Sequence, residues 1–166
     1  MASILPAILL TVACAPPQSA EGPGTLPELA LQKDKPAPAL AEHLLLDYFG
    51  SDIVDPPTVC VAQQGETQGS YDGLPVDDEV ALIERFPQLA PLSRCSFTGG
   101  MWQDSESGEP AMVFDIHSFT CSDDTHCSGW AGYTAGSEKG EYAQYDMSYA
   151  DGRWAFERKD RRLLAK

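Results

Sequence analysis

The chain has few basic residues: 11 lysines and arginines stand against 25 aspartates and glutamates, and the net charge is −14. A protein that binds nucleic acid must neutralise phosphates with lysine and arginine, so this balance argues against a nucleic-acid partner. Six of the basic residues gather within residues 153–166. We interpret them as the solvated face of an edge strand, where charge prevents pairing with other sheets. A patch for nucleic acid or lipid headgroups is the alternative.

The sequence also lacks the common catalytic and nucleotide-binding motifs. It contains no G-x-S-x-G motif, no phosphate-binding or dinucleotide-binding glycine pattern and no EF-hand loop. No internal repeat is visible, which argues against solenoids and propellers. The apolar run within residues 1–13 is shorter than the ~20 residues that a membrane-spanning helix needs. The length predicts a single domain, and no cofactor is expected.

Residues 1–13 carry no charge and are rich in apolar side chains, and Cys14 follows them directly. This composition suits the apolar region of a secretory signal peptide. The segment Leu10-Thr-Val-Ala-Cys14 also resembles a bacterial lipobox, in which a small residue precedes the cysteine that receives the lipid. The resemblance implies cleavage before Cys14 and stable anchoring through two or more acyl chains. An ordinary secreted protein that is cut nearby and an uncleaved anchor are the alternatives.

The residue after Cys14 is Ala15 rather than aspartate, which in lipoproteins of Gram-negative bacteria implies export to the outer membrane. We therefore expect a bacterial cell-envelope protein that is lipid-anchored in the outer membrane and faces the periplasm. Residues 14–38 hold many prolines and few large apolar side chains. Such a segment buries too little surface to order itself and is predicted to be a disordered tether. Residues 39–166 are predicted to form the domain.

Two helices are predicted ahead of the sheet. Residues 39–49 carry leucines and aromatic side chains at helical spacing, and Gly50 ends the helix. Residues 77–86 open with acidic side chains, where the helix dipole favours negative charge, and Asp77 or Asp78 is expected to cap them. Both helices are expected to cover one face of a sheet.

Residues 111–164 have the pattern of four β-strands joined by short turns. Apolar and polar residues alternate most clearly between residues 141 and 149, where Tyr145 and its apolar neighbours share one side. Asp151-Gly152 predicts a hairpin, because a type I′ turn needs positive φ at both central residues. The sequence therefore predicts an α+β fold in which an antiparallel β-meander is packed by two helices.

The chain has five cysteines. If Cys14 carries lipid, four remain in an oxidising compartment, and an even number favours disulfides. Four cysteines allow three pairings. Cys121 and Cys127 flank a turn between adjacent strands, while Cys60 and Cys95 lie on short extended segments on either side of the second helix. We predict the pairs Cys60–Cys95 and Cys121–Cys127.

His117 and His126 lie within a short segment that also holds Cys121 and Cys127. Two histidines and two cysteines could hold a soft metal ion such as zinc. An oxidising compartment would convert the two thiols into a disulfide, so a disulfide-closed hairpin is the preferred interpretation. A metal-dependent or histidine-based hydrolase that uses His117 and His126 is the alternative function. It requires both histidines to project into one pocket with a carboxylate.

Trp130, Tyr133 and Tyr145 are candidates for a binding surface, because aromatic side chains can line a groove for a sugar or a peptide. Such residues are more often cross-strand partners in a core. Our first hypothesis is a non-enzymatic module that binds or supports an envelope protein or peptide through the open face of the sheet. A purely structural lipoprotein without a discrete ligand is a further alternative.

Residues from about 39 to 164 resemble a group of uncharacterised small bacterial envelope lipoproteins. The shared pattern is an N-terminal helix, a segment that ends in a cysteine (Thr58-Val-Cys60), a helix that leads to Pro91-Leu-Ser-Arg-Cys95, and a meander that closes on Tyr149-Ala-Asp-Gly-Arg-Trp154. The resemblance implies the α+β fold and supports the Cys60–Cys95 pair, and it carries no activity. The closing hairpin is also similar to that of cone-shaped α+β folds of the nuclear transport factor 2 and cystatin kinds, which often bind small molecules or peptides.

Overall fold

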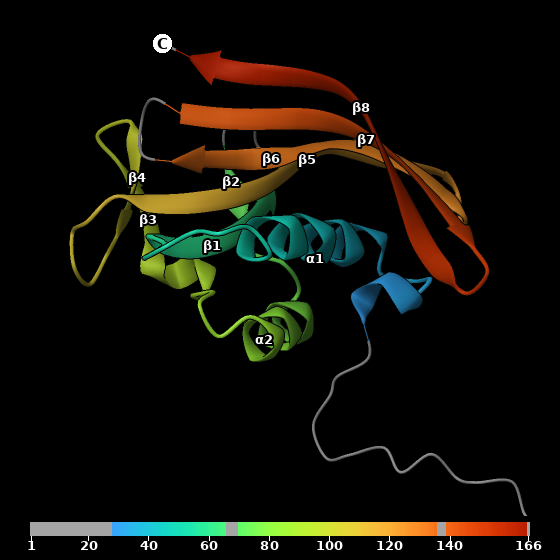
Figure 1. Ribbon diagram of the computed structural model, residues 1–166, viewed down its shortest axis with the longest axis horizontal. Helices are drawn as coiled ribbons and strands as arrows, with labels where there is room; N and C mark the ends of the chain where they lie inside the picture. Colours follow the sequence, from blue (N-terminus) through green and yellow to red (C-terminus); the bar gives the residue numbers. More distant parts are fainter. Residues whose placement is uncertain (1–27, 66–69, 136–138, 166) are drawn as a thin grey trace, which may run out of the picture.

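The computed structural model describes residues 28–65, 70–135 and 139–165, which form a six-stranded sheet beside a two-stranded hairpin (Figure 1). The sheet has the strand order β2-β1-β5-β6-β7-β8. The predicted signal peptide, Cys14 and the predicted tether up to residue 27 lie outside the described residues. The strands are Thr58–Gln64 (β1), Tyr71–Asp72 (β2), Cys95–Thr98 (β3), Met101–Asp104 (β4), Ala111–Asp123 (β5), His126–Ala135 (β6), Lys139–Ala150 (β7) and Arg153–Ala165 (β8).

The predicted four-stranded meander is confirmed as β5 to β8, and each neighbouring pair in it is antiparallel. The turn between β7 and β8 has φ of 53° at Asp151 and 80° at Gly152. These positive values are the ones that an Asp-Gly pair predicts for a type I′ turn. The predicted α+β class is therefore confirmed.

Two further strands extend the sheet beyond the meander. β1, which was predicted as a short extended segment around Cys60, pairs in parallel with β5, and β2 adds to β1 in antiparallel fashion. Parallel neighbours need a crossover connection, and here the chain between them forms α2 and the β3–β4 hairpin. No strand was predicted for the segments of β2 and β4, so the sequence underestimated the amount of sheet.

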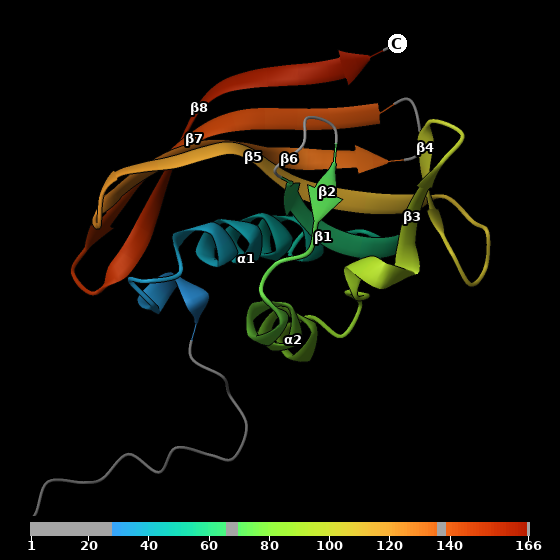
Figure 2. The same cartoon turned by 180° about the vertical axis from the view of Figure 1, so that it is seen from behind.

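One face of the sheet packs against α1, which spans Pro36–Phe49 (Figures 1 and 2). Phe114 and Ile116 of β5 point to this side, and the long strands curve around the helix. α2, which spans Val76–Arg85, lies farther from the long strands in both views. It joins the same core through Leu82, which is fully buried.

The other face of β5 is covered by the β3–β4 hairpin. Val113 belongs to a second buried cluster that also contains Cys60, Cys95 and Trp102. The alternation along β5 predicts one buried face, whereas the structure buries both faces of this strand near its beginning. The second face of β5 is buried by the β3–β4 hairpin, which is not part of the meander.

α1 begins at Pro36, three residues before the predicted start. Proline suits the first turn of a helix, because the N–H that it lacks would have no partner inside the helix. The 3₁₀ turn that precedes it, Leu29–Leu31, also belongs to the domain, since Leu29 and Ala30 are buried. The predicted tether, residues 14–38, is therefore too long at its C-terminal end.

α2 begins and ends one residue earlier than predicted. Pro75 occupies the N-cap position, so neither Asp77 nor Asp78 caps the helix as predicted. Both aspartates lie in the first turn, where the helix dipole favours negative charge. Asp78 forms an ion pair with Lys35, which ties α2 to the residue just before α1.

Both predicted disulfides are present. The sulfur atoms of Cys60 and Cys95 lie 2.01 Å apart, and those of Cys121 and Cys127 lie 2.06 Å apart. The first bond joins β1 to β3 and is buried, whereas the second closes the tip of the β5–β6 hairpin. Among the described residues, no helix combines the length and the apolar composition that crossing a membrane requires.

Candidate functional site

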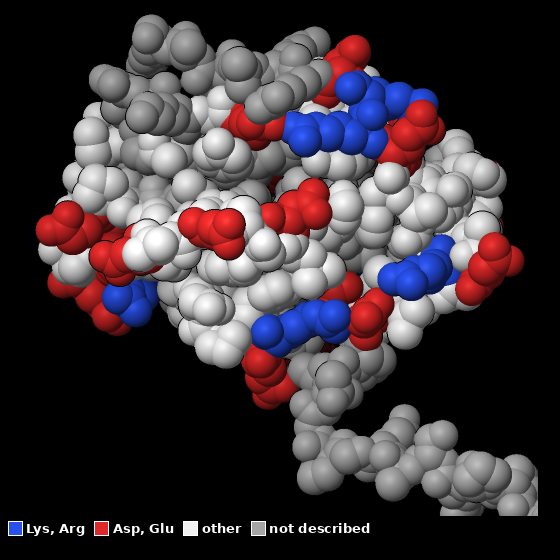
Figure 3. Space-filling model, in the orientation of Figure 1, with Lys and Arg blue, Asp and Glu red and all other residues white. Residues whose placement is uncertain are grey.

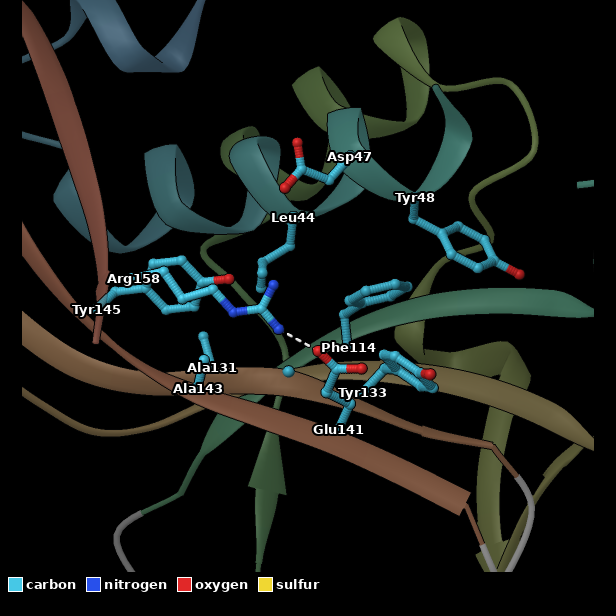
Figure 4. Close-up of a pocket in the computed structure, with 11 residues that line it drawn as sticks. Leu44, Asp47, Tyr48, Phe114, Ala131, Tyr133, Glu141, Ala143, Tyr145 and Arg158 are labelled. Atoms are coloured by element: carbon cyan, nitrogen blue, oxygen red, sulfur yellow. Dashed lines mark hydrogen bonds and ion pairs between the residues drawn. The ribbon is translucent and has the colours of Figure 1, made fainter. Parts of the chain in front are cut away.

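A cavity of about 130 Å³ lies between α1 and the sheet face that the helix covers (Figure 4). Residues of α1 form one side of it, and residues of β5, β6, β7 and β8 form the other. Its lining combines small, aromatic and charged side chains: Leu44, Asp47, Tyr48, Phe114, Ala131, Gly132, Tyr133, Glu141, Ala143, Tyr145 and Arg158.

The floor of the cavity is made of small residues on β6 and β7. Ala131 and Ala143 are directly opposite each other in the antiparallel register, and both side chains are buried. Gly132 lies beside them, and a Cβ atom there would lie 2.0 Å from the Glu141 carbonyl oxygen, so this position accepts only glycine. Large side chains at the two alanines would fill the space that the structure leaves open between helix and sheet.

Aromatic rings form the walls of the cavity. Tyr48 of α1 meets Phe114 of β5 edge to face, with ring centroids 5.2 Å apart, and Phe114 lies 5.7 Å from the ring of Tyr133. Tyr145 closes the opposite side (Figure 4). Burial raises the pKa of Tyr48 and of Tyr145 above the ordinary tyrosine value, so both phenols keep their protons at neutral pH.

Three charged side chains converge on the cavity. Arg158 extends from β8 and donates a hydrogen bond from Nη2 to Oε1 of Glu141 on β7 (Figure 4). The Arg158 side chain is 45% exposed and that of Glu141 20%, which places their ion pair at the mouth. Asp47 faces them from α1 with a side chain that is 69% exposed. Two carboxylates and one guanidinium leave the site with an excess of negative charge.

His43 lies next to the cavity on α1. Its ring stacks on Phe156 with centroids 4.4 Å apart and meets Tyr145 edge to face at 5.8 Å. Burial lowers the pKa of His43, the nearby Arg158 lowers it further, and Asp47 acts in the opposite direction. The imidazole is therefore uncharged at neutral pH. Its Nε2 atom, 4.0 Å from the Asp47 carboxylate, does not neutralise that charge.

The structure brings two of the three sequence-predicted binding residues together. Tyr133 and Tyr145 line the cavity, while Trp130 lies on the other face of the sheet, where its ring is parallel to that of His117 at 6.4 Å. Sequence reasoning missed Asp47, Glu141 and Arg158. The sequence did contain a signal for Arg158. Side chains alternate along a strand, so residue 158 faces the same side as Trp154 and Phe156, which pack against the core.

The two histidines of the alternative hypothesis occupy separate places. His117 lies against Asp115, with Nδ1 3.2 Å from a carboxylate oxygen, and it borders a hollow beside Gln64. His126 pairs with Asp123 at 3.1 Å and borders a different hollow at the hairpin tip. In the described part of the chain they do not share a pocket.

The cysteines that could have joined these histidines as metal ligands are bonded to each other. Within residues 28–65, 70–135 and 139–165, no three side chains of histidine, cysteine, aspartate or glutamate gather closely enough to hold a metal ion. The network on Asp115 is satisfied by protein groups, since the Tyr142 hydroxyl donates to its second oxygen. We interpret Asp115 as a buried carboxylate that holds His117 and Tyr142 in place.

The cavity between α1 and the sheet combines apolar rings, a floor of small residues and three charged side chains. Most ligand pockets are likewise apolar with a few precisely placed polar groups. Its described lining contains no serine, cysteine or histidine side chain that would act as a nucleophile. Comparison of the chain with protein-family models, curated proteins and solved structures found no match in any of the three.

Proposed function

We propose that this protein is a lipid-anchored module of the bacterial cell envelope that binds a small ligand, or one side chain of a peptide, in the cavity between α1 and the sheet. The observation that carries the binding role is the convergence of Asp47, Glu141 and Arg158 on an aromatic cavity whose floor is two alanines. Glu141 is paired with Arg158, and Asp47 is largely exposed, so the mouth of the cavity carries one carboxylate in excess. A ligand that pairs with this carboxylate would neutralise it.

The proposed location rests on the first 14 residues, through the apolar segment and the lipobox-like Leu10-Thr-Val-Ala-Cys14. The two disulfides agree with an exported protein, because such bonds persist in oxidising compartments. The outer membrane facing the periplasm is the proposed site, because Ala15 follows the cysteine. The partners are the membrane, through the lipid, and an envelope ligand.

Changing Cys14 to serine is expected to release the protein from membranes into the soluble fraction, because serine cannot form the thioether that carries lipid. The measurement is fractionation of cells that express the full chain, together with metabolic labelling by a fatty acid. Cys14→Ala serves as a second variant. Unchanged membrane association of both variants, or no label on the unaltered protein, would contradict the anchor.

Filling the cavity is expected to abolish ligand binding without unfolding the protein. Leucine at Ala131 or at Ala143 places three additional carbon atoms in the space between floor and helix. The measurement is a two-dimensional NMR screen of small amines, acids, alcohols and amino acids against the domain. We expect shifts of Tyr133 and Tyr145 signals in the unaltered protein and none in A131L or A143L.

The matched control for the filled variants is Gln144→Leu, which adds apolar volume on the opposite face of β7. Ligands should bind this variant as they bind the unaltered protein. Circular dichroism and thermal melting identify any variant that fails to fold, which is why two filling positions are used. Ligand-induced shifts that persist in both folded variants would overturn the binding role of this cavity.

A further inference from the structure

We infer that the ligand of this cavity is a compact organic cation, an alkylammonium group that enters between Asp47 and Glu141. This inference rests on the proposed function, since it names the chemical class of the ligand. The ammonium group could belong to a free amine or to the lysine side chain of a peptide. Both sources present the same chemistry to the cavity.

The charges at the mouth select for a cation. Arg158 and Glu141 neutralise each other as an ion pair. Among the described residues, the one ion-pair contact of Asp47 is with His43 at 4.0 Å, and the lowered pKa of His43 leaves that ring uncharged at neutral pH. An added ammonium group would bring the local charge to zero, whereas an added carboxylate would increase the negative excess. An opposite charge within a few ångströms is favourable, and a like charge is unfavourable by a similar amount.

The aromatic walls favour the same class of ligand. A cation that lies over the face of a tyrosine or phenylalanine ring is attracted by the negative potential of that face. Tyr48, Phe114 and Tyr133 form a continuous set of rings, with centroids 5.2 and 5.7 Å apart along the series. The alkyl part of the ligand would contact Leu44 and the two floor alanines.

The size of the cavity limits the ligand to a short branched or linear chain. At about 130 Å³ it is smaller than the roughly 300–1,000 Å³ of pockets that hold drug-sized molecules. Figure 3 shows acidic side chains over much of this face, with small clusters of basic side chains beside some of them. The net charge of −14 increases the local concentration of cations at low salt.

The test compares ligands that share one carbon skeleton and differ in charge. The probes are 3-methylbutylamine as the cation, 3-methylbutan-1-ol as the neutral analogue and 3-methylbutanoate as the anion. NMR titration of the full domain at pH 7.5 and low salt gives the dissociation constant of each. We expect the amine to bind at least about threefold more tightly than the alcohol, and the anion more weakly than either. Equal affinity for amine and alcohol, or preference for the anion, would overturn the inference.

Asp47→Asn removes the carboxylate that has no lysine or arginine partner among the described residues, while keeping the shape of the side chain. We expect this variant to lose about threefold to fivefold in affinity for 3-methylbutylamine and to leave affinity for the alcohol unchanged. Asp52→Asn is the matched control, because it removes the same charge from an exposed loop that does not line the cavity. Equal losses in the two variants would mean that only the net charge matters, which contradicts a specific site.

The pH dependence of the affinity for 3-methylbutylamine provides a second test of the same site. His43 faces Asp47 on its own helix and Arg158, Tyr145 and Phe156 on the strands. Because its pKa is lowered, His43 becomes charged only as the pH falls below the ordinary histidine value near 6.5. Affinity for the amine should then fall, since His43 would compete for Asp47. Affinity for the amine that increases as the pH is lowered from 7.5 would contradict this arrangement.

Two peptides distinguish the sources of the ammonium group. Acetyl-Gly-Lys-Gly-amide offers a lysine side chain, and the same peptide with an Nε-acetylated lysine removes its charge. If the unmodified peptide binds at the cavity residues and the acetylated peptide does not, the ligand is a lysine side chain. If 3-methylbutylamine binds and neither peptide does, the ligand is a small free amine. If neither the amine nor a peptide binds but other screen compounds are lost in A131L and A143L, the cation inference fails and the proposed binding function stands.

Discussion

Replacing Cys60 and Cys95 together with alanine is expected to lower the free energy of unfolding by about 4 kcal/mol. The two residues are 35 positions apart in the sequence, so the bond removes much conformational freedom from the unfolded chain. Both sulfurs are buried, and the bond holds the β3–β4 hairpin against β1. Urea denaturation followed by tryptophan fluorescence measures the change, because Trp102 belongs to this cluster.

The second disulfide is the matched control for this experiment. Cys121 and Cys127 are 6 positions apart, and their double alanine variant is expected to lose only about 2 kcal/mol. Cys121 is exposed at the hairpin tip, so a mild dithiol should also reduce this bond first. A larger loss from the Cys121–Cys127 variant, or earlier reduction of Cys60–Cys95, would contradict the roles assigned to the two bonds.

Replacing Glu42 with alanine is expected to lower the free energy of unfolding by about 3 kcal/mol. The carboxylate is 1% exposed and accepts hydrogen bonds from the backbone N–H groups of Leu29 and Ala30, both at 3.1 Å. It also lies 3.2 Å from a guanidinium nitrogen of Arg85 on α2. Removing it leaves two buried amides without their acceptor, and Arg85 keeps only the more exposed Glu28 as a described partner. Urea denaturation measures the loss.

Hydrogen exchange of the Leu29 and Ala30 amides locates this effect, because both should lose protection in the Glu42→Ala variant. Glu28→Gln is the control, since Glu28 is more exposed and contacts Arg85 and Arg153 at 3.6 and 3.2 Å. Exposed ion pairs contribute little, so we expect a loss below about 1 kcal/mol. Similar losses in the two variants would show that Glu42 is no more than another surface charge.

The sequence predicted the meander well because the pattern of a strand is local. Alternation along residues 141–149 and the turn at Asp151-Gly152 depend on neighbouring residues and on backbone geometry alone. The disulfide between Cys121 and Cys127 follows from the same hairpin. The pairing of Cys60 with Cys95 was correct as well, because both residues lie on extended segments on either side of α2, which the fold brings together.

The parts that the sequence missed depend on contacts between distant segments. β2 has only two residues and forms because Gln63 and Gln64 present a free edge to it. The ordered turn before α1 depends on Glu42, whose carboxylate accepts hydrogen bonds from amides 12 and 13 positions away. No short window of sequence contains both sides of these interactions.

The sequence by itself determined the charge excess, the cysteine pairs and which residues of each strand share a face, because these depend on composition and on the two-residue repeat of a strand. The tertiary structure alone decided which face receives α1, and therefore that Tyr133 and Tyr145 line a cavity while Trp130 does not. It also decided that Asp47 of the helix lines the same cavity as Glu141 and Arg158 of the sheet. The physical reason is that a cavity is the space left between packed elements, and its volume depends on small side chains from strands that meet only in the folded chain.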